Sequence, residues 1–129
     1  MTPPETVRII LPLPHRSLSP NHPSITRGGR IQKARETKKY RERAMAAVLA
    51  CGVESGPWEF AKVSAVFYHK ANRRRDQDNA MASIKAAYDG LRDAGLIVDD
   101  DFEHLRRESP TFAIDRECPR VELTVTRIQ

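Results

Sequence analysis

Hydrophobic and polar residues alternate along three stretches of the chain, and a period of two residues is typical of β-strands. These stretches cover residues 7–13, where Pro12 lies near the end, residues 60–69 and residues 121–127. In the last stretch Val121, Leu123 and Val125 alternate with polar residues, which predicts a half-buried strand. A weaker pattern predicts a short strand within residues 102–107.

Two longer stretches have the spacing of amphipathic helices. The first, residues 33–50, places five residues on one stripe before Gly52 ends the helix: Tyr40, Ala44, Ala47, Val48 and Cys51. The second, residues 79–94, begins after Asp78 as the expected N-cap, ends at Gly95, and gathers Ala80, Met81, Ile84, Ala87, Tyr88 and Leu91 on one side. The order β-α-β-α-β-β predicts an α/β (α+β) fold, a mixed β-sheet with two helices packed on it.

A length of 129 residues with 40% hydrophobic and 30% charged residues predicts one globular domain over residues 1–129. The longest apolar stretch, residues 44–53, is shorter than the ~20 residues that span a bilayer, and the chain does not begin like a signal peptide. We therefore expect a cytoplasmic protein with no membrane partner. Cys51 and Cys118 have no metal-like spacing and are expected to be packing residues.

Charge is unevenly distributed along the chain. The formal net charge is +5 and the sequence pI is about 9.6, which favours a polyanionic partner. Residues 27–43 contain eight basic and two acidic residues, and a second basic cluster, residues 70–75, runs directly into Asp76 and Asp78. An acidic cluster follows at residues 99–103. The basic clusters are suited to the phosphates of a nucleic acid.

The acidic residues beside these clusters indicate a metal site. Asp76 and Asp78 are one residue apart, so in extended backbone both carboxylates point to the same side. Together with residues 99–101 they offer the hard oxygen ligands that suit Mg²⁺ or Mn²⁺, the ions of metal-dependent nucleases. Simpler interpretations are a helix cap at Asp78, an ion pair between Asp76 and a neighbouring arginine, and a solvated turn at residues 99–101.

One extended motif is specific. It consists of Arg75, Asp76, Asp78, Asn79, Lys85, Asp89, Leu91, Ala94, Gly95, Asp99 and Asp100. In these residues the chain resembles the RusA-like Holliday junction resolvases, a family of endodeoxyribonucleases common in phages. The likeness extends more loosely to the first strand with its following loop (LPLPHRSLSPN), to the basic first helix and to the closing strand (RVELTVTRI).

The resemblance implies a Mg²⁺-dependent homodimer that makes paired symmetric incisions in a four-way DNA junction. It implies Asp76, Asp78 and Asp100 as metal-binding catalytic carboxylates and Lys85 as the catalytic lysine. Asp101 extends the acidic run beyond the family pattern, so Asp99 or Asp101 is an alternative to Asp100 or assists it. The residues expected to contact DNA are Arg73, Arg74, Arg75, Asn79, Asn21, Lys33, Lys38 and Lys39.

Lys85 departs from the family spacing, in which the lysine follows the Asp-Asn step after about one turn. Here it is the seventh residue after Asp78. One continuous helix would keep Lys85 within about 20° of Asp78 around the axis, about 10.5 Å further along. The alternative role is an exposed ion pair with Asp89. The four histidines have no spacing that suggests a general base.

Two other functions fit the same sequence. The first alternative is a non-catalytic basic nucleic-acid-binding protein with a structural acidic turn, and the second is a related metal nuclease that acts on another branched DNA. A requirement for metal would distinguish a nuclease from the binding protein. The choice of substrate would distinguish a junction resolvase from the other metal nuclease.

Overall fold

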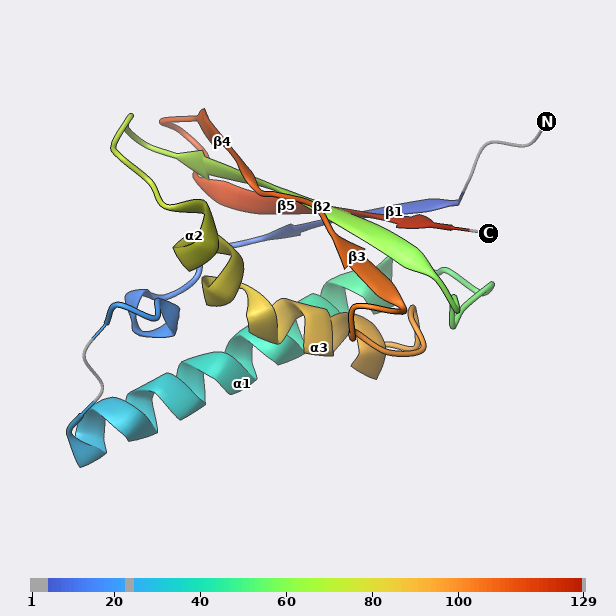
Figure 1. Cartoon of the computed structure of the whole chain (residues 1–129), viewed down its shortest axis with the longest axis horizontal. Helices are drawn as coiled ribbons and strands as arrows, with labels where there is room; N and C mark the ends of the chain where they lie inside the picture. Colours follow the sequence, from blue (N-terminus) through green and yellow to red (C-terminus); the bar gives the residue numbers. More distant parts are fainter. Residues whose placement is uncertain (1–4, 23–24, 129) are drawn as a thin grey trace.

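The computed structural model describes residues 5–22 and 25–128 (Figure 1). In these residues a five-stranded sheet carries helices on one face. The strands are β1 (Thr6–Leu11), β2 (Ala61–His69), β3 (Leu105–Arg107), β4 (Thr111–Ile114) and β5 (Arg120–Arg127). The helices are α1 (Arg27–Ala50), α2 (Gln77–Ser83) and α3 (Lys85–Asp93), with a short 3-10 turn, η1 (Arg16–Leu18). This is the mixed α/β domain that the sequence predicts.

The sheet is mixed, and its central strands come from distant parts of the chain. The order is β1-β5-β2-β3. β4 also pairs with β2, so β2 has both β3 and β4 as partners. β5 runs antiparallel to both β1 and β2, whereas β3 and β4 run parallel to β2. Alternate residues of β1, β2 and β5 are buried under the helices, as their period of two predicts.

α1 packs against α3 at very short range. A Cβ atom added at Gly90 of α3 would lie 2.4 Å from the Arg41 carbonyl oxygen of α1. Tyr40, Ala44 and Val48 form the buried stripe of α1, and the Tyr40 hydroxyl donates a hydrogen bond of 2.8 Å to the Pro12 carbonyl. This contact fixes α1 to the segment that leaves β1.

The opposite face of the sheet has no helix over it in the described part of the chain (Figure 1). Its most buried polar group is Glu122 of β5, whose side chain is 5% exposed. Arg8 of β1 and Arg120 both pair with this carboxylate, Arg120 at 2.7 Å. The Arg120 guanidinium also lies 3.9 Å from the ring centre of Tyr68. These contacts compensate the buried charge.

Three element boundaries differ from the expectation. α1 begins at Arg27 and not at residue 33, because the Thr26 hydroxyl accepts a hydrogen bond from the Gly29 amide and caps the helix. The first strand ends at Leu11, two residues early. The strand expected over residues 102–107 is confined to Leu105–Arg107, because Asp101 closes a turn onto the amides of His104 and Leu105.

The second helix is not continuous. It breaks at Ile84, whose φ of −107° and ψ of 12° are not helical, and so becomes α2 and α3. The Ser83 hydroxyl donates to the Ala80 carbonyl at 2.7 Å, and such back-bonding bends helices. The Ile84 side chain is fully buried at the bend. The N-cap is Asp76 and not Asp78 as expected.

Two further expectations are corrected. Cys51 and Cys118 are both exposed and are not packing residues, because Cys51 follows the last residue of α1 and Cys118 lies in the turn before β5. β4 is a strand that the sequence pattern does not reveal.

Among the described residues no helix is both long and apolar enough to cross a membrane.

Candidate functional site

Asp76 and Asp78 lie where the loop after β2 enters α2. Asp76 caps the helix: its Oδ1 accepts hydrogen bonds from the Asp78 amide at 2.8 Å and the Asn79 amide at 3.2 Å. Asp78 follows in the first turn, and both residues are exposed. The Oδ2 atom of Asp76 has no hydrogen-bond partner among the described residues. Two carboxylates at the helix entrance are therefore open to a hard cation.

Asp100 has a different environment, after α3. Its side chain is 14% exposed and lies 3.4 Å from Arg92 Nη1 and 3.6 Å from Arg107 Nη2. Arg107 also donates to the Asp100 carbonyl at 2.7 Å and stacks over the Tyr88 ring at 4.5 Å. Arginines therefore compensate the charge of Asp100 within the chain.

Neighbouring carboxyls affect the titration of this acidic turn. Burial raises the pKa of Asp100, and hydrogen bonds with the carboxyls of Asp89 and Asp99 raise it further. The pKa of Asp99 is lowered, because its carboxylate accepts a 2.7 Å hydrogen bond from the Asp100 amide. Asp101 pairs with the His104 ring at 2.6 Å, which lowers the pKa of Asp101 and raises that of His104. The acidic turn therefore combines an aspartate that is harder to ionise, Asp100, with one that ionises more readily, Asp99.

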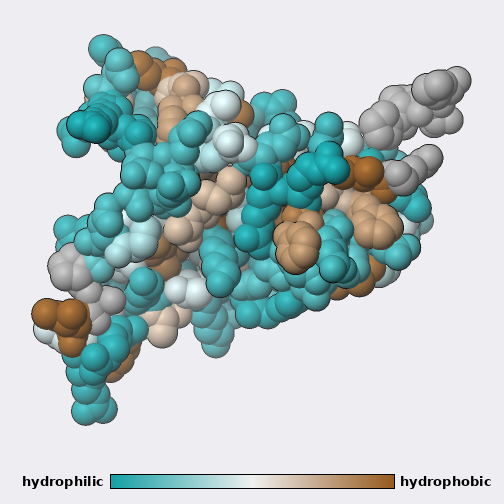
Figure 2. Space-filling view, in the orientation of Figure 1, coloured by the Kyte–Doolittle hydropathy of each residue, from teal (hydrophilic) through white to brown (hydrophobic). Residues whose placement is uncertain are grey.

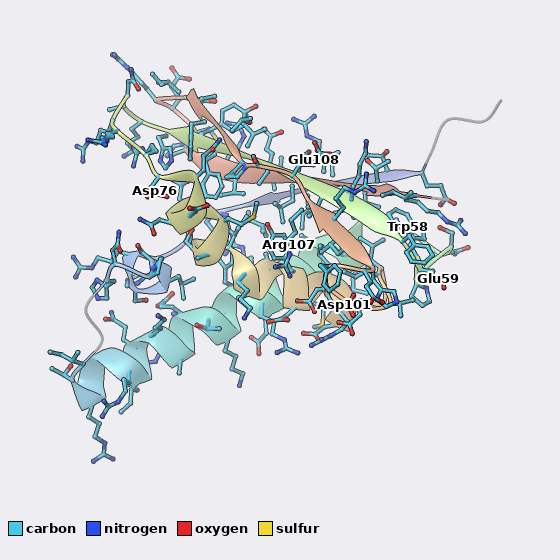
Figure 3. All side chains as sticks on the ribbon, in the orientation of Figure 1. Trp58, Glu59, Asp76, Asp101, Arg107 and Glu108 are labelled. Carbon is cyan, nitrogen blue, oxygen red and sulfur yellow. The ribbon has the colours of Figure 1, made fainter. Side chains whose placement is uncertain are left out.

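The two groups of carboxylates are not brought together within one chain. The seven residues of α2 and the nine residues of α3 separate them. Figure 3 shows Asp76 at the start of α2 and Asp101 beyond the other end of α3. Among the described residues no group of three His, Cys, Asp or Glu side chains is placed to hold one ion. Asp100 is therefore not in the same cluster as Asp76 and Asp78 in one chain.

Lys85 is the first residue of α3 and follows the break at Ile84. The continuous helix that would align Lys85 with Asp78 does not exist. Lys85 instead lines a hollow of about 320 Å³ together with Lys33, Thr37 and Asp89, and none of the three expected metal ligands lines it. The described residues include no Lys85–Asp89 salt bridge; the Asp89 carboxylate lies 3.8 Å from Arg92 instead.

The arginines before α2 share a pocket with Asp76. Arg73, Arg74 and Arg75 are exposed on the loop after β2, and Arg74, Arg75 and Asn79 line a hollow of about 380 Å³ with Asp76. No sequence motif indicates this hollow, because its walls come from segments far apart in the chain: the segment after β1 with η1, the end of β2 and the loop after it, α2, and β4. Three of the expected DNA-binding residues therefore surround one expected metal ligand.

The other expected DNA-binding residues lie on α1 and before it. Lys38 and Lys39 are exposed, with Lys39 3.6 Å from Glu36, and Lys33 is half-buried. A hollow of about 780 Å³ runs along this helix, lined by Lys33 and Lys38 among others, and no expected metal ligand borders it. Asn21 lies in a turn, where its backbone N–H donates a hydrogen bond of 3.4 Å to the Ser19 hydroxyl oxygen. Hydrophilic side chains cover much of α1 and the loop before α2 (Figure 2).

Two comparisons with known proteins found no match. No protein-family model matches this chain, and no curated protein matches it. The likeness to RusA-like resolvases therefore depends on the motif residues and their spacing.

Proposed function

We propose that the protein is a Mg²⁺-dependent, structure-selective DNA endonuclease that resolves four-way junctions as a homodimer. The observation that carries this proposal is the entrance of α2, where the open carboxylates of Asp76 and Asp78 follow directly on three exposed arginines. Mg²⁺, or Mn²⁺, bound there would polarise a phosphodiester and lower the pKa of a bound water. The arginines hold the neighbouring phosphates in register with the carboxylates.

The separation of the carboxylates supports the dimer. Asp100 lies beyond α3 and cannot join Asp76 and Asp78 of its own chain. We expect a two-fold axis to bring the acidic turn of one copy (residues 99–101) to the arginine loop of the other (residues 73–75), because these two segments have opposite charge. A four-way junction has the same two-fold symmetry, so two equivalent sites make two opposed cuts.

Conservative variants test the metal ligands. Asp76→Asn keeps the helix cap, because Asn caps as well as Asp, but removes a metal ligand. We expect both this variant and Asp78→Asn to lose cleavage of labelled four-way junctions in Mg²⁺ while binding them as tightly as the wild type or more tightly. Glu54→Gln, at an exposed loop position, removes the same charge elsewhere and should cut normally. Cleavage by Asp76→Asn at a near wild-type rate would remove Asp76 from the site.

Subunit mixing tests whether the site is shared. Asp76→Asn and Asp100→Asn are each expected to be inactive alone. If each site combines Asp76 of one copy with Asp100 of the other, a mixed dimer has one fully intact site, and random exchange makes about half of the dimers mixed. Mixing should therefore restore nicking. If each site lies within one chain, the mixture stays inactive, and the shared-site arrangement is wrong.

One observation favours a second function, a non-catalytic nucleic-acid-binding protein. Arg92 and Arg107 lie 3.4 Å and 3.6 Å from the Asp100 carboxylate and compensate its charge, as expected of a structural turn. Four-way, splayed-arm and linear DNA offered in Mg²⁺, in Ca²⁺ and in a chelator separate the two functions. Cleavage of the junction in Mg²⁺ alone supports the nuclease, and binding that is the same in all three without any cleavage supports the binder.

A further inference from the structure

The hollow of about 380 Å³ beside Asp76, which we name the base pocket, has a floor of aromatic rings. Phe67 of β2 pairs in register with Phe112 of β4, and their ring centres are 5.7 Å apart. The His69 ring lies 6.1 Å from Phe67 at 15° between planes, and 6.2 Å from Phe112. Phe67 is buried, whereas Phe112 and His69 are half-buried and line the pocket. The pocket therefore offers flat apolar surfaces to a ligand.

The rim of the base pocket is polar and positively charged. Arg16, Arg74 and Arg75 border it, and the Asn79 side chain makes no hydrogen bond with the described residues. Its volume lies within the range of small-molecule sites, roughly 300 to 1,000 Å³. A flat apolar floor with cations around its mouth is complementary to a nucleotide, whose base is flat and whose phosphate is an anion.

We propose that the base pocket takes one unpaired base of the DNA strand that is cut. The base stacks on Phe112 and His69, and Arg74 and Arg75 bind its phosphate beside Asp76. This inference deepens the proposed nuclease function and depends on it for the identity of the strand. In linear duplex every base is stacked and paired, and extruding one is costly. Bases at the crossover of a branched DNA are unpaired more easily, so the pocket favours branched substrates.

The test compares DNA with and without bases, in a chelator so that no metal contributes. The full-length protein is titrated with a short single-stranded oligonucleotide and with an oligonucleotide of the same length whose sugars are all abasic. The wild type should bind the first at least about tenfold more tightly, as expected for one stacked base. Phe112→Leu keeps an apolar side chain but removes the ring, and should lose most of this preference. Phe102→Leu, at a side chain that is 89% exposed, should keep it.

A second variant keeps the test decisive if Phe112→Leu unfolds. Asn79→Ala alters a half-buried rim position, and it should change the relative affinity for the four 5′-deoxynucleotides, because Asn side chains read base edges. Equal binding of the base-containing and abasic strands by the wild type would overturn the base pocket. The proposal would also be overturned if mononucleotides bound and the oligonucleotide failed to displace them, because the pocket would then be a site for a free nucleotide and not for a base of a DNA strand.

These outcomes are independent of the cleavage assays. Junction cleavage with no preference for bases would leave the endonuclease standing without this pocket. A preference for bases, lost in Phe112→Leu, with no cleavage of any junction would support the pocket in a binding protein and refute the endonuclease.

Discussion

Replacing Gly90 by Ala tests how closely α1 and α3 are packed. The added Cβ atom would lie 2.4 Å from the Arg41 carbonyl oxygen, 2.8 Å from Ala44 Cβ and 3.1 Å from the Met45 amide nitrogen. Two of these three atoms belong to the backbone of α1, so no side-chain rotation relieves the contact. The two helices must move apart, and the residues around Ala44 then lose packing.

Two opposing effects set the size of the change. Ala is favoured over Gly within a helix by about 0.8 to 1 kcal/mol. Overpacking a core costs about 1 to 3 kcal/mol, and a contact with backbone belongs at the upper end of that range. The free energy of unfolding should therefore fall by about 1 to 2 kcal/mol. For a domain of this size the melting temperature should fall by about 3 to 8 °C.

Urea unfolding measures this change directly. Trp58 is the single tryptophan of the chain and is 1% exposed, so its fluorescence reports loss of the core. Gly28→Ala is the matched control, because an added Cβ at this position of α1 meets nothing within 4 Å and the variant should be as stable as the wild type or slightly more so. If Gly90→Ala were as stable as Gly28→Ala, the close packing of the two helices would be refuted.

Three further predictions concern charge. Glu122→Ala removes the carboxylate that pairs with Arg8 and Arg120, while Arg120 keeps its second partner, Asp115, at 2.8 Å; the free energy of unfolding in urea should fall by about 1 to 3 kcal/mol, less than for a fully buried pair because Arg8 is exposed. Asp101→Asn should lower the pKa of His104, followed by NMR; the pair stabilises the fold below the ordinary histidine pKa and loses this effect as the pH rises through the raised value. DNA affinity should fall linearly on a log-log plot between ~50 and ~200 mM salt, and a flat line would contradict phosphate contacts from α1 and the arginine loop.

Hydrophobic periodicity predicts the strands that bury one face and expose the other. β1, β2 and β5 each have one buried face, so their alternation is visible in the sequence. The break at Ile84 is not visible, because its apolar side chain continues the helical stripe while the backbone leaves the helix. β4 is missed because four residues are too few to establish a period, and its place is decided by pairing with β2.

The candidate site was predictable only in part. The spacing of Asp76 and Asp78 places them together, because two residues that close in sequence share one helix entrance. The position of Asp100 depends on the length and bend of the intervening helices, which local patterns do not encode. The aromatic floor is invisible in the sequence, because Phe67 and Phe112 meet only through the parallel pairing of β2 with β4.

The central position of β5 has a consequence for synthesis. Of the five strands it is the last to be synthesised, yet it lies between β1 and β2. Its pairing with β1 brings Thr126 opposite Thr6, so the two partners are separated by nearly the whole described chain. Until residues 120–127 have left the ribosome, β1 has no partner and β2 lacks its neighbour on one side. Such long-range pairing slows folding and leaves strand edges open to other nascent chains. Premature termination before residue 120 should therefore give an aggregating product and not a smaller folded one.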